Sequence, residues 1–207
     1  MNKIIYTAIS DNYDTLKDPA IITPGWQYIC YTNNKAVKSN VWQVIYLDSL
    51  TVKEQRKIKI IPPFEYDICI WIDGSLLVSC NLDEFITENH KGYFTLMKHP
   101  NRNCVYEEAN ACIIRGKDDQ DVIINQMTVY KNRNYPSNNG MVATGLMIRE
   151  NKPLVHIFSS YWWNHVERYS KRDQLSFNVS VHYCKMYYNL ISFDVLKKEF
   201  ILNKHNK

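Results

Sequence analysis

The stretch that most constrains the fold is Tyr66–Ile72, "YDICIWI", an almost wholly apolar run that ends at Asp73. A run without regular polar alternation is expected of a central strand in a parallel sheet, because helices cover both of its faces. Strand patterns at 3–9, 27–31 and 41–47 precede this run. Because helical patterns alternate with strands along the rest of the chain, we predict an α/β fold with a mainly parallel central sheet.

The later elements keep this alternation. A helix is predicted at 51–61, where the charges lie on one side, and Asn81 is typical of the N-cap of a second, short helix. Strands are predicted at 92–98 and 141–149. Further helices are predicted at 104–131, in two pieces split near Gly116, and at 159–169 and 172–183. Since no linker rich in proline or glycine divides the chain, we expect a single domain over 1–207.

Composition and missing motifs exclude several classes of function. Hydrophobic residues make up 45% of the chain, which is enough for a sizeable core and argues against disorder. The formal charge of +4 and the lack of any known nucleic-acid-binding module mean that no nucleic-acid partner is expected. No Gly-x-Gly-x-x-Gly or Walker loop occurs, which disfavours dinucleotide and P-loop chemistry.

The expected location is the cytoplasm. The six cysteines show no Cys-x-x-Cys or zinc spacing, and several, such as Cys30 and Cys69, sit inside apolar runs, where free cysteine behaves as a small core residue; this favours a reducing compartment. The N-terminus lacks the pattern of a signal peptide, and no apolar run of about 20 residues could span a membrane. The basic segment at the end of the chain, "LKKEFILNKHNK", could make a peripheral contact with the inner face of an anionic membrane, or form a solvated helix.

Polar side chains follow three of the predicted strands. Asp11, Asn33 and Asp73 each come just past a strand, and parallel α/β sheets bind ligands beyond the carboxyl ends of their strands. Asp73 with Gly74 could hold Mn²⁺ or Mg²⁺ carrying a diphosphate, since these hard cations need few protein carboxylates. Ser75 could donate to a sugar hydroxyl or bind the metal weakly. A structural alternative, in which Asp73 only caps the next turn, is equally open from this stretch.

A second polar cluster is "KHPNRNCVYEEA", residues 98–109. The planar fork of Arg102 suits a phosphate or carboxylate, and Glu107 could hold that side chain in place. His99 could bind an acceptor, ligate a metal or simply occupy a turn. This cluster is therefore a candidate wall of a substrate pocket.

A third cluster is "SKRDQLSFNV", residues 170–179, where Asp173 and Gln174 open a helix and Ser170 is a candidate N-cap. Asp173 could act at a reacting sugar carbon as base, nucleophile or electrostatic stabiliser, or only complement the helix dipole. Trp163, upstream, could stack on a sugar ring, although tryptophan is also a common core residue.

Read in order, seven stretches resemble one protein family. They are "YTAISDNYD", "WQYICYTNN", "RKIKIIPP", "YDICIWIDGSL", "KHPNRNCVYEEA", "GLMIRE" and "RDQLSFN". From about residue 4 to about residue 180, the chain resembles the glycosyltransferase-like domain family of plant mucilage-related proteins and bacterial polysaccharide gene clusters. The most specific parts of the resemblance are "IWIDGS" and "RDQLSF".

The resemblance implies a GT-A fold, which is a Rossmann-like α/β/α sandwich, and a nucleotide-diphosphate sugar as donor, with a UDP-sugar favoured. By position in the family, Thr7, Ala8 and Tyr13 would lie beside the base and ribose. Arg56 and Lys59 fall where related sequences also carry basic residues, and would face the diphosphate.

The same resemblance assigns the catalytic end of the site. Asp73 takes the place of the metal-binding aspartate, and Ser75 replaces the second aspartate of the usual Asp-x-Asp element. Asp173 and Gln174 resemble the Asp-Gln pair at the active site of some retaining GT-A enzymes. With His99, Arg102 and Glu107, Trp163 completes the set of residues expected to line the donor or acceptor pocket.

The expected function is therefore that of a hexosyltransferase-type glycosyltransferase, assisted by Mn²⁺ or Mg²⁺ and of retaining type. It would transfer a sugar to a glycan or lipid-linked acceptor in surface polysaccharide synthesis. Two other readings stay open at this point: a non-catalytic carbohydrate-binding protein on the same fold, and a metal-dependent hydrolase or nucleotidyltransferase.

Overall fold

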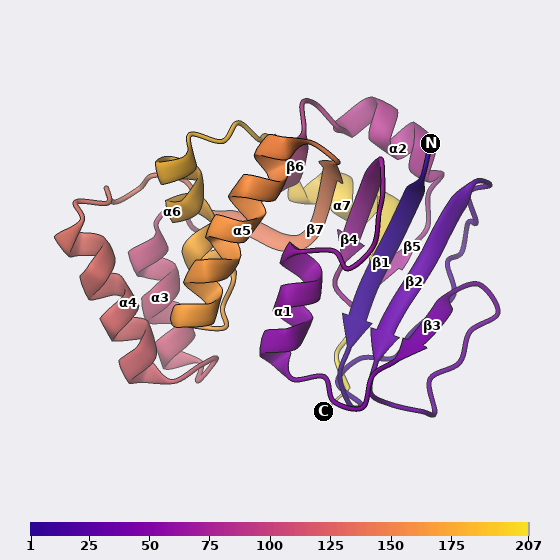
Figure 1. Ribbon diagram of the computed structural model, residues 1–207, viewed down its shortest axis with the longest axis horizontal. Helices are drawn as coiled ribbons and strands as arrows, with labels where there is room; N and C mark the ends of the chain where they lie inside the picture. The colour runs from indigo at the N-terminus through magenta and orange to yellow at the C-terminus, as the bar shows by residue number, and fades with distance from the viewer. Residues whose placement is uncertain (207) are drawn as a thin grey trace.

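The computed structural model describes residues 1–206, so the last residue of the basic C-terminal segment, Lys207, lies outside the described residues. Its centre is a seven-stranded sheet of order β3-β2-β1-β4-β7-β6-β8 (Figure 1). The strands of this sheet are β1 (Lys3–Ile9), β2 (Trp26–Thr32), β3 (Gln43–Tyr46), β4 (Ile68–Ile72), β6 (Phe94–Lys98), β7 (Val142–Glu150) and β8 (Asn189–Ile191). β7 runs antiparallel to β4 and β6, and the other neighbouring strands pair in parallel.

Strand β4 lies in the middle of the sheet, between β1 and β7. All five of its residues are buried, because side chains from both faces of the sheet cover them. The prediction of a central strand from the apolar run is confirmed, and the regular strand begins at Ile68.

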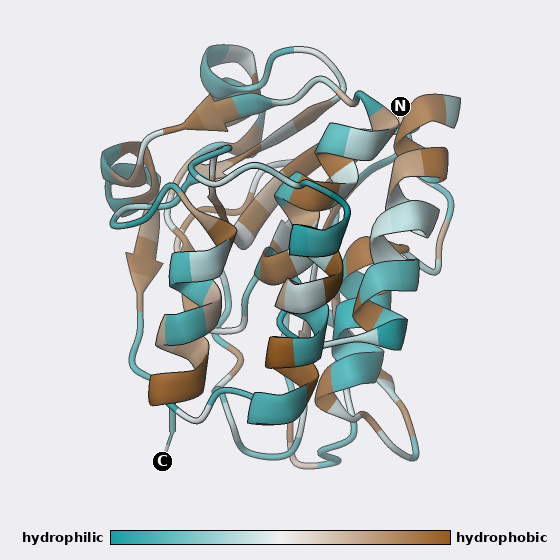
Figure 2. Cartoon of the chain, turned by 90° about the vertical axis from the view of Figure 1, so that its left-hand side faces the viewer, coloured by the Kyte–Doolittle hydropathy of each residue, from teal (hydrophilic) through white to brown (hydrophobic). Residues whose placement is uncertain are grey.

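Helices cover both faces of the sheet and complete an α/β/α sandwich (Figure 1). They are α1 (Val52–Ile60), α2 (Leu82–Asn89), α3 (Val105–Ile114), α4 (Gln120–Asn132), α5 (Pro153–Arg168), α6 (Gln174–Cys184) and α7 (Phe193–Glu199). α1, α5 and α6 share one core with the sheet, and α2 and α7 share the other. α3 and α4 pack against α6 around a third, smaller core. The helices in Figure 2 show hydrophilic and hydrophobic residues interspersed along the same ribbon, as expected of helices with one buried and one exposed face.

Helix α1 is fixed at both ends. This is important because α1 carries Arg56 and Lys59, two of the residues expected to bind the donor. At its start, Thr51 and Glu54 form a capping box. At its end, the fully buried Arg149 of β7 donates to the carbonyl oxygens of Lys59 and Ile60, at 2.6 and 2.7 Å. A cation at the carbonyl end of a helix also complements the helix dipole. Arg149 therefore ties the last turn of α1 to the centre of the sheet.

Several boundaries differ from the sequence predictions. Helix α5 begins at Pro153, well before the predicted start at 159, because proline is pre-organised for the first turn of a helix. Asp173, and not Ser170, stands at the N-cap position of α6; the Ser170 hydroxyl instead donates to Asp118, at 2.6 Å.

Three short strands were not predicted from the sequence. β5 (Leu76–Val78) pairs with β9 (Phe200–Leu202) in a second, two-stranded sheet, and β8 joins the edge of the main sheet. In the basic segment "LKKEFILNKHNK", for which a solvated helix was one alternative, only residues 196–199 belong to helix α7, and β9 follows directly. Strands of three residues leave too short a pattern for periodicity to reveal.

All six cysteines are free thiols. Over residues 1–206, every helix is either too short or too polar to cross a bilayer.

Candidate active site

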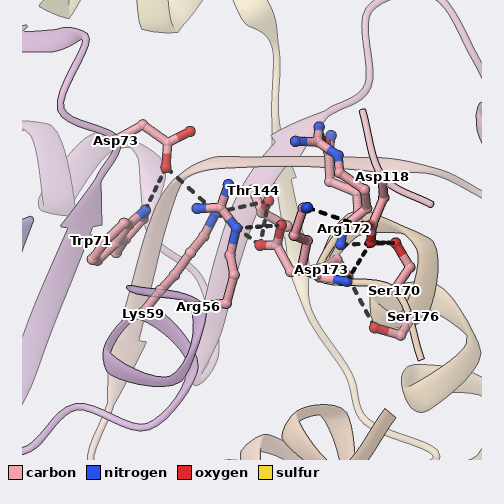
Figure 3. Close-up of polar contacts among 12 residues, drawn as sticks. Arg56, Lys59, Trp71, Asp73, Asp118, Thr144, Ser170, Arg172, Asp173 and Ser176 are labelled. Atoms are coloured by element: carbon pink, nitrogen blue, oxygen red, sulfur yellow. Dashed lines mark hydrogen bonds and ion pairs between the residues drawn. The ribbon is translucent and has the colours of Figure 1, made fainter. Parts of the chain in front are cut away.

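A pocket of about 310 Å³ opens beyond the carboxyl ends of β1 and β4. Asp73, the residue directly after β4, lies in its wall. The Asp73 amide donates to the carbonyl oxygen of Gly145 on β7, at 2.8 Å. Its carboxylate Oδ1 accepts from the indole Nε1 of Trp71, at 2.9 Å (Figure 3). The side chain of Asp73 is therefore oriented by the strand that delivers it and by the neighbouring antiparallel strand.

Lys59 joins Asp73 to Asp173, a residue far along the chain. Its side chain is 1% exposed, and its ammonium lies 2.8 Å from Oδ2 of Asp173 and 3.4 Å from Oδ1 of Asp73. It also donates to the hydroxyl of Thr144, at 3.0 Å. A lysine ammonium has three hydrogens to donate, so these three oxygens account for all of them. Lys59 lines the same pocket and holds the two carboxylates in place by contacting both (Figure 3).

Asp173 is almost completely buried yet remains charged. Its carboxylate accepts from the Thr144 hydroxyl at 2.9 Å and lies 3.4 Å from the Nε of Arg56. Burial alone would raise the pKa of this carboxyl, but Lys59 and Arg56 together hold that pKa well below its usual range. Asp173 is thus a fixed negative charge in the pocket wall at any pH near neutrality.

Two other predicted residues border Asp173 in the same pocket. Arg56, from the middle of α1, is partly exposed and lines the pocket beside its contact with Asp173. The side-chain amide of Gln174 donates to the carbonyl oxygen of Val142, at 3.1 Å, which fixes the first turn of α6 against β7. The structure therefore brings together Arg56, Lys59, Asp73, Asp173 and Gln174.

Of the residues expected near the nucleotide, Ala8, Tyr13 and Ser75 line the pocket. Thr7 is buried within β1, where its hydroxyl has no hydrogen-bond partner among the described residues. Asp11 and Asn33 bond to each other past the ends of β1 and β2, outside the lining of this pocket.

The predicted cluster around His99 does not contribute to the wall of the pocket. Arg102 donates to Oε2 of Glu108 at 2.7 Å, and His99 Nε2 lies 3.6 Å from the same oxygen. Glu108, rather than the predicted Glu107, therefore holds Arg102, because Glu108 is buried and Glu107 is exposed. Burial lowers the pKa of His99 despite the neighbouring carboxylate.

Trp163 also lies away from the pocket. It is half-buried on α5, and the ammonium of Lys57 lies 5.8 Å from its ring centroid. Trp163 therefore packs at the edge of the hydrophobic core and contacts a lysine ammonium.

The pocket also contains residues for which no role was predicted from the sequence. Its further polar residues and one glycine are Asp14, Lys117, Thr144, Gly145, Arg172 and His205. Gly145 opens the stretch "GLMIRE" and Arg172 opens "RDQLSFN", so the signal was present in stretches already quoted for the family resemblance. His205 belongs to the C-terminal segment, where its ring lies 4.7 Å from that of Tyr13 and its Nδ1 lies 2.6 Å from Asp14.

The residues around Asp73 fit a divalent cation held by a single carboxylate. Its contacts with Trp71 and Lys59 both involve Oδ1. A Cβ at Gly145 would lie 3.2 Å from the other oxygen, Oδ2, so this glycine keeps space open beside it. Residues 1–206 contain no cluster of three histidine, cysteine or acidic side chains that could hold a metal by itself. Water and a bound diphosphate would have to supply the remaining ligands.

The sheet, its covering helices and the pocket at the strand ends define the GT-A-like class of α/β folds. The bifunctional glycosyltransferase WbbM matches 92% of this chain and 38% of its own, at 10% identity and a TM-score of 0.52. Mouse xyloside xylosyltransferase 1 matches 92% of this chain and 85% of its own, at 8% identity and a TM-score of 0.50. At such low identity these likenesses show the fold alone.

The chain belongs to the TOD1/MUCI70 glycosyltransferase-like domain family, whose model matches residues 26–206. A curated relative, the probable hexosyltransferase MUCI70 of Arabidopsis thaliana, is 24% identical over 84% of this chain. The match covers 36% of that relative, so the chain spans about a third of its length. The family resemblance and the fold class predicted from the sequence are both confirmed.

Proposed function

We propose that this chain transfers a sugar from a nucleotide-diphosphate sugar, with a UDP-sugar favoured, to a glycan or lipid-linked acceptor in surface polysaccharide synthesis. Membership of a glycosyltransferase-like family and a GT-A-like fold support the reaction class. The name of the curated relative supports a hexose as the transferred sugar. The free cysteines agree with a reducing, cytoplasmic setting, and the basic C-terminal segment is the proposed membrane contact.

The observation that carries the proposal is the pair of carboxylates held by the buried ammonium of Lys59. Two aspartates from β4 and from the start of α6 face one pocket at fixed positions, with charges balanced from beneath. Fixed charges in a site shielded from water stabilise charge that develops during a reaction, because they need not reorient. This arrangement suits a substrate that separates into a cationic sugar and an anionic diphosphate.

In this reaction Arg56 would contact the diphosphate, whereas Lys59 would act by positioning the two carboxylates. The Arg56 guanidinium lines the pocket and uses its Nε toward Asp173. Asp73 would hold Mn²⁺ or Mg²⁺, which when bound would neutralise the charge of the leaving diphosphate. Ser75 lies beside Asp73 in the pocket and would contact the donor.

Asp173 would stabilise positive charge at the anomeric carbon. A carboxyl whose pKa lies well below the usual range is a weak proton acceptor, so Asp173 is better suited to electrostatic stabilisation than to general base catalysis. Gln174 would line the acceptor side of the same carbon. We also propose a retaining course, which rests on the resemblance of Asp173 and Gln174 to the Asp-Gln pair of some retaining GT-A enzymes.

The test is to incubate the protein with UDP-, GDP- and dTDP-activated hexoses, each with Mn²⁺, Mg²⁺ or a chelator. Release of the nucleotide and of free or transferred sugar is then measured by chromatography. We expect release that depends on the metal and that Asp73→Ala reduces at least a hundredfold, the order of loss seen for one electrostatic group in an active site. Asp121→Ala, an exposed aspartate on α4, is the matched control and should leave release unchanged.

Three outcomes would contradict the proposal. Oligosaccharide binding without turnover of any donor would identify a carbohydrate-binding protein. Release of free sugar at a rate that no acceptor changes would identify a hydrolase. Full activity in Asp73→Ala would show that the site lies elsewhere.

A further inference from the structure

A second hollow lies beside the candidate active site, between the later turns of α6 and two nearby loops. Its lining residues are Asn139, Asn178, Val181, His182, Lys185, Met186, Tyr187 and Tyr188. The set contains amide, imidazole and phenol groups and no carboxylate. Lys185 is its one permanently charged side chain. We call this set of residues the α6 groove.

The polar network at the base of the α6 groove is incomplete. Asn178 is 3% exposed, and its amide nitrogen donates to the hydroxyl of Tyr188 at 3.0 Å. Its amide oxygen has no partner among the described residues. The Tyr188 hydroxyl accepts from Asn178 and so keeps its own hydrogen to donate. The Asn178 oxygen itself is closed to solvent, so a neutral ligand rich in hydroxyl groups would bind this network by accepting from the Tyr188 hydroxyl.

The rim of the groove presents an aromatic ring to solvent. Tyr187 is 90% exposed, and it directly follows the αL residue Lys185 and the buried Met186 in the turn after α6. A tyrosine ring offers an apolar face and a polar tip, which suits a ligand that is apolar on one face and polar at its edges. Sugar rings have this character, since their C–H groups lie on the faces and their hydroxyls at the edges.

Two segments of the chain run from the candidate active site into the α6 groove. Gln174 lines the active-site pocket and Asn178 lines the groove, and residues four apart lie on the same face of a helix, about 6 Å along its axis. The segment from Asn139 to Ala143 makes the same passage. Gly140 lies within it, and a Cβ there would lie 3.2 Å from the Asn178 amide nitrogen.

We propose that the α6 groove binds the sugar chain of the acceptor, as a neutral hexose oligosaccharide, beyond the unit that receives the new sugar. This inference rests on the proposed function, because it takes the pocket at Asp73 as the place of transfer. The groove would then favour long acceptors over short ones, since Tyr187 lies outside the lining of the active-site pocket.

The test measures binding of cellohexaose, mannohexaose and chitohexaose, and of their monosaccharides, by isothermal titration and saturation-transfer NMR. We expect at least one hexasaccharide to bind more tightly than its monosaccharide. Tyr187→Ala should weaken that binding about tenfold, the effect of losing one good aromatic contact. Tyr187→Phe keeps the ring and should restore it. Tyr93→Ala, an exposed tyrosine outside the groove, is the matched control and should bind normally.

Donor turnover without acceptor separates this inference from the proposed function. Nucleotide release in Tyr187→Ala should equal that of the wild type, because this residue lies outside the donor pocket. If Tyr187-dependent binding is found but no donor is turned over, the α6 groove is confirmed as an oligosaccharide-binding site and the proposed function is wrong. If donors are turned over but no hexasaccharide binds, or Tyr187→Ala binds as well as the wild type, the groove proposal is wrong.

Discussion

Replacing Lys59 by methionine should destabilise the fold more than any exposed lysine replacement. Methionine keeps most of the volume of the buried stem but removes the ammonium that lies 2.8 Å from Asp173. The Asp173 carboxylate, whose side chain is 3% exposed, then keeps Arg56 as its ion-pair partner and the more distant charge of Arg172. Removing one partner of a buried ion pair costs about 3–5 kcal/mol, because the other charge stays buried without compensation. The main-chain anchors of α1 to Arg149 are unaffected by this change.

The assay is urea unfolding followed by tryptophan fluorescence, together with thermal melting. For a chain of this size the expected loss corresponds to a fall in Tm of about 10 °C. Lys57→Met, at an exposed position of the same helix, is the control; it loses only the contact of its ammonium with the Trp163 ring and should cost no more than about 1 kcal/mol. Adding Asp173→Asn to Lys59→Met should recover part of the loss, since a neutral amide needs no counterion.

The loss of stability in Lys59→Met should also depend on pH, because Asp173 titrates differently in the two proteins. In the wild type the pKa of Asp173 is lowered by its cations, so its contribution to stability is present above the unfolded pKa of about 3.9 and is lost only as the pH falls well below it. Without Lys59, burial raises the pKa of Asp173. The difference in stability between variant and wild type should therefore be largest near pH 7 and shrink as the pH approaches 4. A free energy of unfolding for Lys59→Met that lies within about 1 kcal/mol of the wild-type value at pH 7 would contradict this prediction.

Three further predictions follow from other contacts. Gly145→Ala places a Cβ 3.2 Å from Oδ2 of Asp73, and should reduce metal-stimulated donor release more than tenfold while the circular dichroism spectrum stays unchanged. Glu108→Gln should lower the free energy of urea unfolding by about 2–4 kcal/mol, because Arg102 loses a buried charged partner at 2.7 Å; an unchanged unfolding midpoint would contradict this. Burial lowers the pKa of His165 to about 4, so stability should be full above about pH 6.5 and fall by about 3 kcal/mol between there and pH 4. His165→Gln should flatten this pH profile.

Local patterns in the sequence were sufficient to predict most of the sheet and several helices. The run at β4 has no polar alternation, so burial on both faces follows from it directly. Thr51 and Glu54 specify the start of α1 through contacts only three residues apart. Features of this kind depend on near neighbours in the chain, and a single sequence contains them.

Features that depend on distant parts of the chain could not be predicted in this way. Lys59 and Asp173 are brought together by the packing of α1 and α6 on the same face of the sheet, which no local pattern records. The antiparallel direction of β7 is likewise invisible in its own residues. Glu107 and Glu108 are adjacent acids of equal propensity, and only the packing of α3 decides that Glu108 faces Arg102.

The three-way contact of Lys59 also explains why the family motifs lie so far apart in sequence. "RKIKI" supplies the ammonium, "IWIDGS" and "RDQLSF" supply the two carboxylates, and "GLMIRE" supplies Arg149, which fixes the helix end that carries Lys59. Changing any one of these groups leaves a buried charge or a helix terminus without its partner. In the proposed reaction, therefore, a loss of activity in Lys59→Met would reflect displacement of Asp73 and Asp173, and it should appear in kcat at least as strongly as in KM. A variant that raised KM for the donor alone would instead indicate that Lys59 binds the diphosphate directly.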